Sequence, residues 1–129
     1  MTLDRLNQHF VLRQRLIKEE AILQTIRDKA QPGAQALTGM PRPSGVHDKV
    51  ADLVEQIVFL EGCIAPLRKT VEEDAKEIEE FIGSLEDHVA GVCFSLRYFH
   101  CLGWKEVADI IGNYQTENSV KKLCYSYLE

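Results

Sequence analysis

The sequence predicts an all-α protein in which a long helical hairpin, or coiled-coil arm, precedes a C-terminal head of three short helices. A seven-residue repeat of apolar residues runs from Val50 to Leu85, a Pro/Gly-rich stretch precedes it at 31–45, and two short amphipathic segments end the chain. No segment shows the alternation of apolar and polar residues that is typical of a half-buried strand. We therefore expect an arm over residues 1–83 and a head over residues 84–129.

The first helix of the arm is expected over residues 2–30. Its apolar residues form a wide stripe at helical spacing, and Pro32-Gly33 ends the pattern. The residues of this stripe are Leu3, Leu6, Phe10, Leu16, Ile17, Leu23 and Ile26.

The connector at 31–45 contains three prolines and three glycines, so it is expected to be extended. In one interpretation it is a corner between two helices, and Ser44 or Asp48 caps the helix that follows. In the other it is a partner-binding loop that displays Met40 and Arg42. The corner is the favoured interpretation.

The second helix of the arm is expected from Val46 to Ile82 and carries a regular heptad seam. Only Asp74 interrupts the apolar residues of that seam, and Pro66, which should bend the helix, lies off it. Gly83 is expected to end the helix. The seam residues are Val50, Leu53, Ile57, Leu60, Ile64, Leu67, Val71, Asp74, Ile78, Phe81 and Leu85.

Charge is segregated along the arm. Residues 1–45 hold seven Lys/Arg and four Asp/Glu, whereas residues 46–83 hold four and ten. A basic first helix and an acidic second helix favour an antiparallel pair. The alternative is that the basic residues contact phosphate, and these residues are Arg5, Arg13, Arg15, Lys18 and Arg27.

The seam is longer than the first helix can cover, which predicts a homodimer. Asp74 argues against this dimer, because two facing copies would repel in a parallel pair, whereas an antiparallel arrangement would place each beside Lys69, Lys76 or an Arg of the first helix. The sequence leaves the parallel and antiparallel arrangements both open.

The head is expected to begin with a supporting helix from Ser84, its N-cap, to about Cys101, followed by helices at 104–111 and 117–128. The middle helix buries an apolar face that includes Trp104 at the junction of the head. Gly112 ends this helix, and Thr116 caps the last one. Two short helices joined in this way indicate a helix-turn-helix, whose second helix enters a DNA major groove.

The head contains the short motifs Arg97-Tyr98, Gly103–Ala108 (GWKEVA), Gly112 and Ser119–Lys122 (SVKK). A further motif, Gly39–Asp48 (GMPRPSGVHD), lies upstream of the head. In these residues the chain resembles small phage and prophage regulators whose C-terminal domain is similar to region four of bacterial sigma factors. The resemblance covers about residues 37–129. It implies a phage-encoded, DNA-binding regulator of transcription that acts in the bacterial cytoplasm.

The expected function is therefore sequence-specific DNA binding by the last helix. Asn is suited to adenine and Lys to guanine or phosphate, and Thr116 and Lys121 would hold the backbone. The candidate DNA-binding residues are Thr116, Glu117, Asn118, Ser119, Lys121, Lys122 and Tyr125. However, residues 84–129 hold four Lys/Arg against six Asp/Glu, so this binding should be weak and sensitive to salt.

The alternative function is a protein-binding adaptor or inhibitor that keeps the helix-turn-helix fold. The acidic head and the acidic stripe at 72–80 would suit RNA polymerase or the basic channel of a host enzyme that handles nucleic acid.

Other classes of site have little support in the sequence. There is no phosphate-binding glycine loop and no convergent catalytic set, so we expect no enzyme activity, no small-molecule substrate and no cofactor. No apolar run is long enough to span a bilayer, which favours a cytoplasmic protein with no membrane partner. The only metal candidates are His88, Cys93, His100 and Cys101, whose spacing does not match structural zinc sites; reduced thiols packed between helices are favoured.

Overall fold

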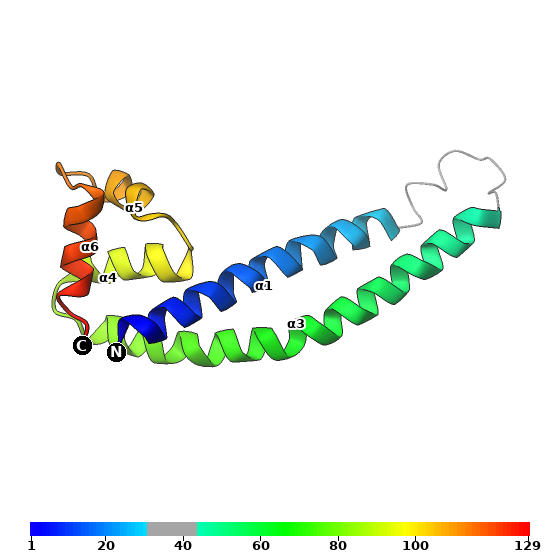
Figure 1. Cartoon of the computed structure of the whole chain (residues 1–129), viewed down its shortest axis with the longest axis horizontal. Coiled ribbons are helices and arrows are strands. Elements are labelled where there is room, and N and C mark those ends of the chain that lie inside the picture. Colours follow the sequence, from blue (N-terminus) through cyan, green and yellow to red (C-terminus); the bar gives the residue numbers. More distant parts are fainter. Residues whose placement is uncertain (31–43) are drawn as a thin grey trace. The chain divides into compact units, whose positions relative to one another are not determined.

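The computed structural model describes residues 1–30 and 44–129, and within them every regular element is a helix (Figure 1). The all-α prediction is therefore confirmed. The two interpretations of the connector concern residues 31–43, which lie outside the described residues. The helices are α1 (Leu3–Ala30), α3 (Ser44–Ser84), α4 (His88–Phe94), the π-helical segment η1 (Ser95–Phe99), α5 (Trp104–Ile111) and α6 (Glu117–Tyr125).

The described chain forms two compact units, and both long helices contribute to each. Unit 1 contains residues 1–15 and 69–129, and unit 2 contains residues 16–68. The start of α1 and the end of α3 thus belong to the same unit as the short C-terminal helices. The boundary that the sequence predicted at residue 83 falls inside unit 1.

The two long helices have nearly the predicted bounds. Helix α1 ends at Ala30, and α3 continues past Pro66 to Ser84. In unit 2 the two helices pair in opposite directions, because Arg27 forms an ion pair with Glu61 while Arg68, farther along α3, lies 2.9 Å from Glu20, farther back along α1. The basic and acidic residues therefore pair within one chain.

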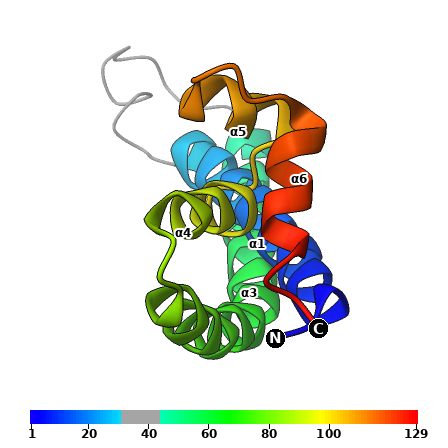
Figure 2. The ribbon, with the colours of Figure 1, turned by 90° about the vertical axis from the view of Figure 1, so that its left-hand side faces the viewer.

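Unit 1 has a core built from aromatic rings that runs from the end of α3 to α6. Phe81 meets Phe94 edge-on at 5.4 Å between ring centroids, and Phe94 stacks on Tyr98 at 6.2 Å. Tyr98 then meets Trp104 edge-on at 6.2 Å. Figure 2 shows the ribbons of α4, α5 and α6, three helices of unit 1 that contribute residues to this core. The fully or largely buried members of the core are Leu6, Ile78, Cys93, Phe94, Tyr98, Trp104, Val107, Ala108, Val120 and Cys124.

The predicted supporting helix of the head is wrong in its start and its continuity. It begins at His88, because the carboxylate of Asp87 accepts hydrogen bonds from the backbone N–H groups of Val89 (2.9 Å) and Ala90 (3.2 Å). Ser84 instead ends α3 and donates its hydroxyl to the carbonyl of Phe81. After α4 the chain widens into η1, and Cys101 takes a left-handed conformation (φ 56°), so no single helix runs to Cys101.

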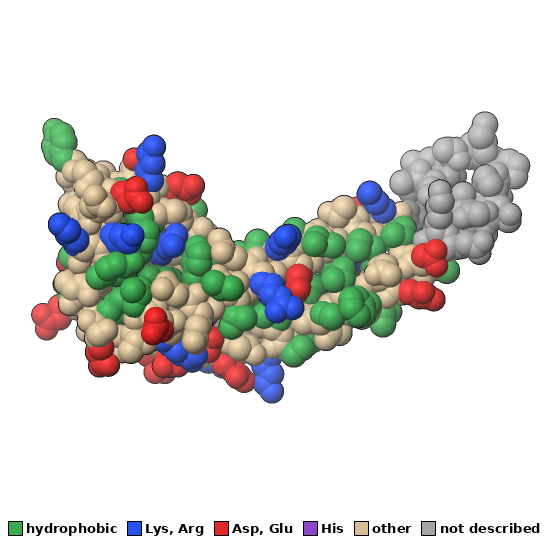
Figure 3. All heavy atoms as spheres, viewed as in Figure 1, with side chains coloured by type: hydrophobic (Ala, Val, Ile, Leu, Met, Phe, Trp, Pro, Cys, Tyr) green, Lys and Arg blue, Asp and Glu red, His purple; other side chains and the backbone are tan. Residues whose placement is uncertain are grey.

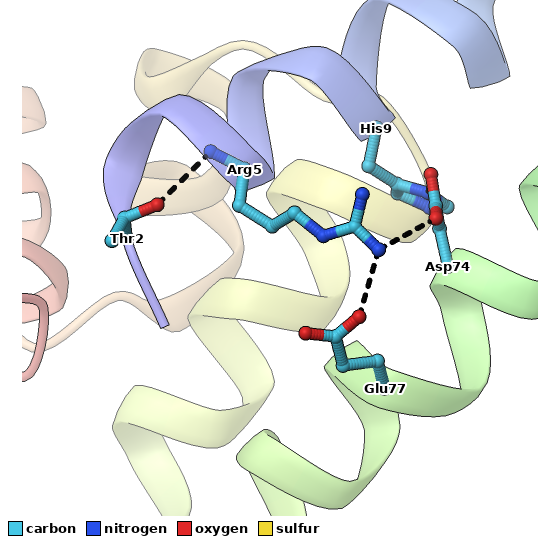
Figure 4. A network of polar contacts seen from close by, with 5 residues as sticks. All are labelled: Thr2, Arg5, His9, Asp74 and Glu77. Atoms are coloured by element: carbon cyan, nitrogen blue, oxygen red, sulfur yellow. Dashed lines mark hydrogen bonds and ion pairs between the residues drawn. The ribbon is translucent and has the colours of Figure 1, made fainter.

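A partly buried polar network holds the start of α1 against α3 in unit 1 (Figure 4). Arg5 donates to Asp74 at 2.8 Å and to Glu77 at 2.7 Å. The His9 side chain is fully buried between Asp74, whose carboxylate is 3.9 Å from Nδ1, and Arg13, which donates to Nε2 at 3.1 Å. The interruption of the seam by Asp74 is thus matched by an Arg of the first helix, in the same chain.

We expect the stability of unit 1 to fall in mild acid because of His9. Burial, and then the neighbouring Arg13, lower the pKa of His9 from its usual value near 6.5, whereas Asp74 raises it and Arg5 lowers it further. Because the folded-state pKa lies below the unfolded-state pKa, the contribution of neutral His9 is complete above about pH 6.5 and is lost as the pH falls through the folded-state value.

This expectation is checked by urea unfolding titrations that are repeated at several pH values from 8 to 5. The variant His9→Gln is the control, because glutamine can still accept from Arg13 but does not titrate. A decline in stability below about pH 6.5 that is equally steep in wild type and in His9→Gln would contradict the assignment to His9.

Candidate functional site

Helix α5 has the predicted bounds and packs one face into the core. Trp104, Val107 and Ala108 are buried, with Trp104 at the predicted junction of the head. Gly112 follows the helix with a φ of 70°, a conformation that costs glycine little, and its N–H donates to the carbonyl of Ala108.

Arg97 fixes the approach to α5. Its guanidinium lies over the rings of Phe10 (4.2 Å) and Trp104 (5.2 Å). It also donates to the backbone carbonyl of Leu102 at 3.0 Å. Arg97, one of the motif residues of the resemblance, therefore makes structural contacts inside unit 1.

The turn between α5 and α6 displays an aromatic residue that the sequence reasoning did not select. After Gly112, both Asn113 (φ 53°) and Tyr114 (φ 60°) adopt left-handed conformations. Such a conformation is unfavourable for a bulky residue such as tyrosine. The Tyr114 side chain is fully exposed, and Ile110 of α5 is also exposed. The pair Gly112-Asn113 is the one local feature of the sequence that predicts this turn, since glycine and asparagine are the residues that best tolerate positive φ.

The first turn of α6 is closed by a reciprocal pair of hydrogen bonds. The Thr116 hydroxyl accepts from the N–H of Ser119 at 3.2 Å, and the Ser119 hydroxyl accepts from the N–H of Thr116 at 2.8 Å. The Ser119 hydroxyl also lies 2.8 Å from the side-chain oxygen of Gln115. The N-cap prediction is confirmed. Both hydroxyls, although they are candidate DNA contacts, are engaged in this cap.

The inner side of α6 is anchored by Val120 and Cys124, both buried. Cys124 lies beside Cys93 of α4. Burial, and then that neighbouring thiol, raise the pKa of Cys124 to about 12, while burial raises the pKa of Cys93. Both thiols are free and protonated near neutral pH, so they serve as packing groups and are weak nucleophiles. The helix ends at Tyr125, three residues before the predicted end.

The outer side of α6 carries Glu117, Asn118 and Lys122, which are all exposed. We call these three residues the outer face of α6. They form no side-chain hydrogen bond or ion pair with the described part of the chain. Lys121 is half-buried, with its ammonium 6.0 Å from the ring of Tyr125, and Tyr125 in turn meets Trp104 edge-on at 6.0 Å. The seven candidate residues thus divide into a capping pair, a lysine–tyrosine contact and the outer face.

Charged side chains of both signs are exposed on unit 1 (Figure 3). Figure 3 shows Lys/Arg and Asp/Glu side chains interspersed over the displayed face of unit 1, without a continuous basic surface. This agrees with the excess of acidic residues over residues 84–129.

The four metal candidates of the head do not converge. Cys93 is buried, whereas His88 and His100 line an open groove of about 420 Å³ between the end of α3, α4 and η1. Among the described residues, no group of three or more His, Cys, Asp or Glu side chains is placed to hold a metal ion.

No described helix combines the length and the apolar character needed to cross a membrane. Comparison of the chain with protein-family models, with curated proteins and with solved structures found no match.

Proposed function

We propose that the protein is a DNA-binding regulator of transcription that reads the major groove with α6, as the resemblance to phage regulators with a sigma-region-four-like domain implies. One observation carries the proposal. Helix α6 is capped at Thr116 and anchored by Val120 and Cys124, yet its outer face of Glu117, Asn118 and Lys122 has no structural role within the described chain. A rigid helix with an unused polar face is what direct base readout requires.

Each residue of the outer face has a definite chemical role in this proposal. Asn118 can pair with the N6 and N7 atoms of adenine, Lys122 can donate to guanine or phosphate, and Glu117 can accept from the amino group of cytosine. Thr116 and Ser119 act indirectly, because their hydroxyls hold the first turn of α6.

Removing both adjacent lysines is expected to weaken DNA binding and its dependence on salt. If Lys121 and Lys122 each contact a phosphate, Lys121→Ala/Lys122→Ala should lower the slope of log affinity against log salt by about two units. Fluorescence anisotropy with a labelled mixed-sequence duplex, titrated at several salt concentrations, measures this slope. Lys76→Ala is the matched control, since Lys76 is an exposed lysine of α3.

An unchanged slope in the double variant would remove these lysines from the interface. Asn118→Ala provides a second readout that concerns sequence. Duplexes selected by the wild-type protein from a random pool should share a common base pattern, and Asn118→Ala should lose its preference at one position of that pattern.

A second candidate function is favoured by the acidic composition of residues 84–129 and by the exposed apolar side chains of Ile110 and Tyr114. The same head could then bind a protein, such as RNA polymerase or a host enzyme that handles nucleic acid. A pull-down from bacterial lysate with and without nuclease separates the two functions. A partner held through DNA is lost after nuclease treatment, whereas a directly bound partner remains.

A further inference from the structure

The turn between α5 and α6 is a type I′ β-turn with a tyrosine at a position where glycine is usual. Its central residues, Asn113 and Tyr114, have positive φ values of 53° and 60°, and the N–H of Gln115 donates to the carbonyl of Gly112 at 3.0 Å. Asparagine is favoured at the first central position of such a turn, but glycine is strongly favoured at the second. The backbone at Tyr114 is therefore strained, and a glycine there would avoid this strain.

The Tyr114 side chain does not stabilise the fold in compensation. It is fully exposed, and it forms no ring contact or hydrogen bond with the described part of the chain. The other three tyrosines each form such a contact, with Trp104 or with Asp87. A strained residue whose side chain has no partner within the fold is a candidate for contact with a ligand.

Tyr114 is continuous with the outer face of α6. Every residue from Asn113 to Asn118 is exposed. The Cα atoms of Tyr114 and Glu117 are at most ~11 Å apart, which corresponds to about three base steps along one DNA strand. A duplex that is read by the outer face therefore has its sugar–phosphate backbone within reach of this turn.

The surroundings of Tyr114 favour a nucleic acid backbone over a protein surface. The run from Asn113 to Asn118 contains no Lys or Arg and a single carboxylate, and its other side chains are uncharged and polar. Ile110 is the one other large apolar side chain that is exposed between residues 104 and 118. Two such side chains do not form the extended apolar patch that marks a protein-binding surface. A phenol among amide and hydroxyl groups instead suits hydrogen bonding to phosphate.

We propose that Tyr114 is a further DNA contact of the head, whose phenol hydroxyl donates to a phosphate oxygen beside the base pairs that α6 reads. This inference rests on the proposed function. Contacts of uncharged side chains with phosphate fix the register of a reading helix but carry no sequence information. Because the phenol is neutral, its contact adds affinity without adding to the salt slope, in contrast to the contacts of Lys121 and Lys122.

Tyr114→Phe removes only the hydroxyl and therefore tests this contact. In anisotropy titrations with the labelled mixed-sequence duplex, we expect about tenfold weaker binding at every salt concentration and an unchanged salt slope. A mixed-sequence duplex suffices, because a phosphate contact does not depend on the bases. Tyr127→Phe is the matched control. Tyr127 is also exposed, but its hydroxyl donates to Asp87 at 3.4 Å, so this variant should bind as wild type does.

Tyr114→Gly separates binding from a structural role. Glycine relieves the left-handed strain, so this variant should unfold a few degrees above wild type in thermal denaturation. It should nevertheless bind the duplex at least about tenfold more weakly than wild type. An unfolding temperature below that of wild type would show that the ring supports the fold, and the proposal would be wrong.

The remaining outcomes distinguish this contact from the proposed function. If wild type and Tyr114→Phe bind the duplex equally well, the contact is absent although reading by α6 stands. If wild type does not bind the duplex, both proposals fail. A third outcome is a partner from nuclease-treated lysate that wild type retains and Tyr114→Gly loses, while both bind the duplex equally. That result would assign Tyr114 to a protein-binding surface and overturn the proposal.

Discussion

Replacement of Phe94 by alanine is expected to lower the free energy of unfolding of unit 1 by about 3–5 kcal/mol. The Phe94 ring is fully buried and lies between Phe81 and Tyr98 in the aromatic core. Its removal would forfeit the transfer free energy of the ring and both aromatic contacts, and it would leave a cavity that rigid neighbours cannot fill. Trp104, the single tryptophan, lies in the same core and reports the transition in a urea titration followed by fluorescence.

Val92→Ala is the matched control for this prediction. Val92 lies on the same helix, but 48% of its surface is exposed, so the change should alter stability by at most about 0.5 kcal/mol. A loss of less than about 1 kcal/mol in Phe94→Ala would show that the ring does not support the core as described.

The second large effect is expected from Arg5→Met, which should lower the free energy of unfolding by about 2–3 kcal/mol. The substitution leaves the buried carboxylate of Asp74 without its hydrogen-bonded cation, beside the neutral ring of His9. The expected loss is smaller than for a fully buried pair, because 38% of the Arg5 side chain is exposed and water can partly replace it.

The double variant Arg5→Met/Asp74→Leu should recover stability to within about 1 kcal/mol of wild type, because an apolar residue then completes the seam. Glu77→Ala serves as the control. The Glu77 side chain is 56% exposed, so the loss of its ion pair should cost about 0–0.5 kcal/mol. If the double variant is as unstable as Arg5→Met, the cost does not come from the unpaired carboxylate.

The features that the sequence predicted correctly depend on neighbouring residues. The bounds of α5 follow from its apolar spacing and from Gly112, and the start of α6 follows from the cap at Thr116. The course of α3 follows from a heptad pattern that tolerates one proline. Each of these signals lies within a few residues of the feature that it specifies.

The features that the sequence reasoning missed depend on competition or on distant partners. Both Ser84 and Asp87 can cap a helix. Because the Ser84 hydroxyl donates to the carbonyl of Phe81 at the end of α3, Asp87 is the residue that caps α4. His9 is buried beside Asp74, a residue far along the chain, so no local pattern in the sequence signals its burial. At the candidate site, spacing placed Lys121 and Tyr125 on the DNA-facing side, but their contact with each other and with Trp104 requires the packed structure.

The composition of unit 1 affects how the chain folds during synthesis. Leu6 belongs to the same core as Val120 and Cys124, and the backbone of Glu129 donates to the carbonyl of Met1 at 3.2 Å. Leu6 therefore leaves the ribosome more than a hundred residues before its core partners on α6. At roughly 5–20 residues per second, the apolar side of early α1 stays uncovered for seconds on a nascent chain. A ribosome stalled before α6 would hold a chain in which the core of unit 1 lacks Val120 and Cys124 and is therefore incomplete.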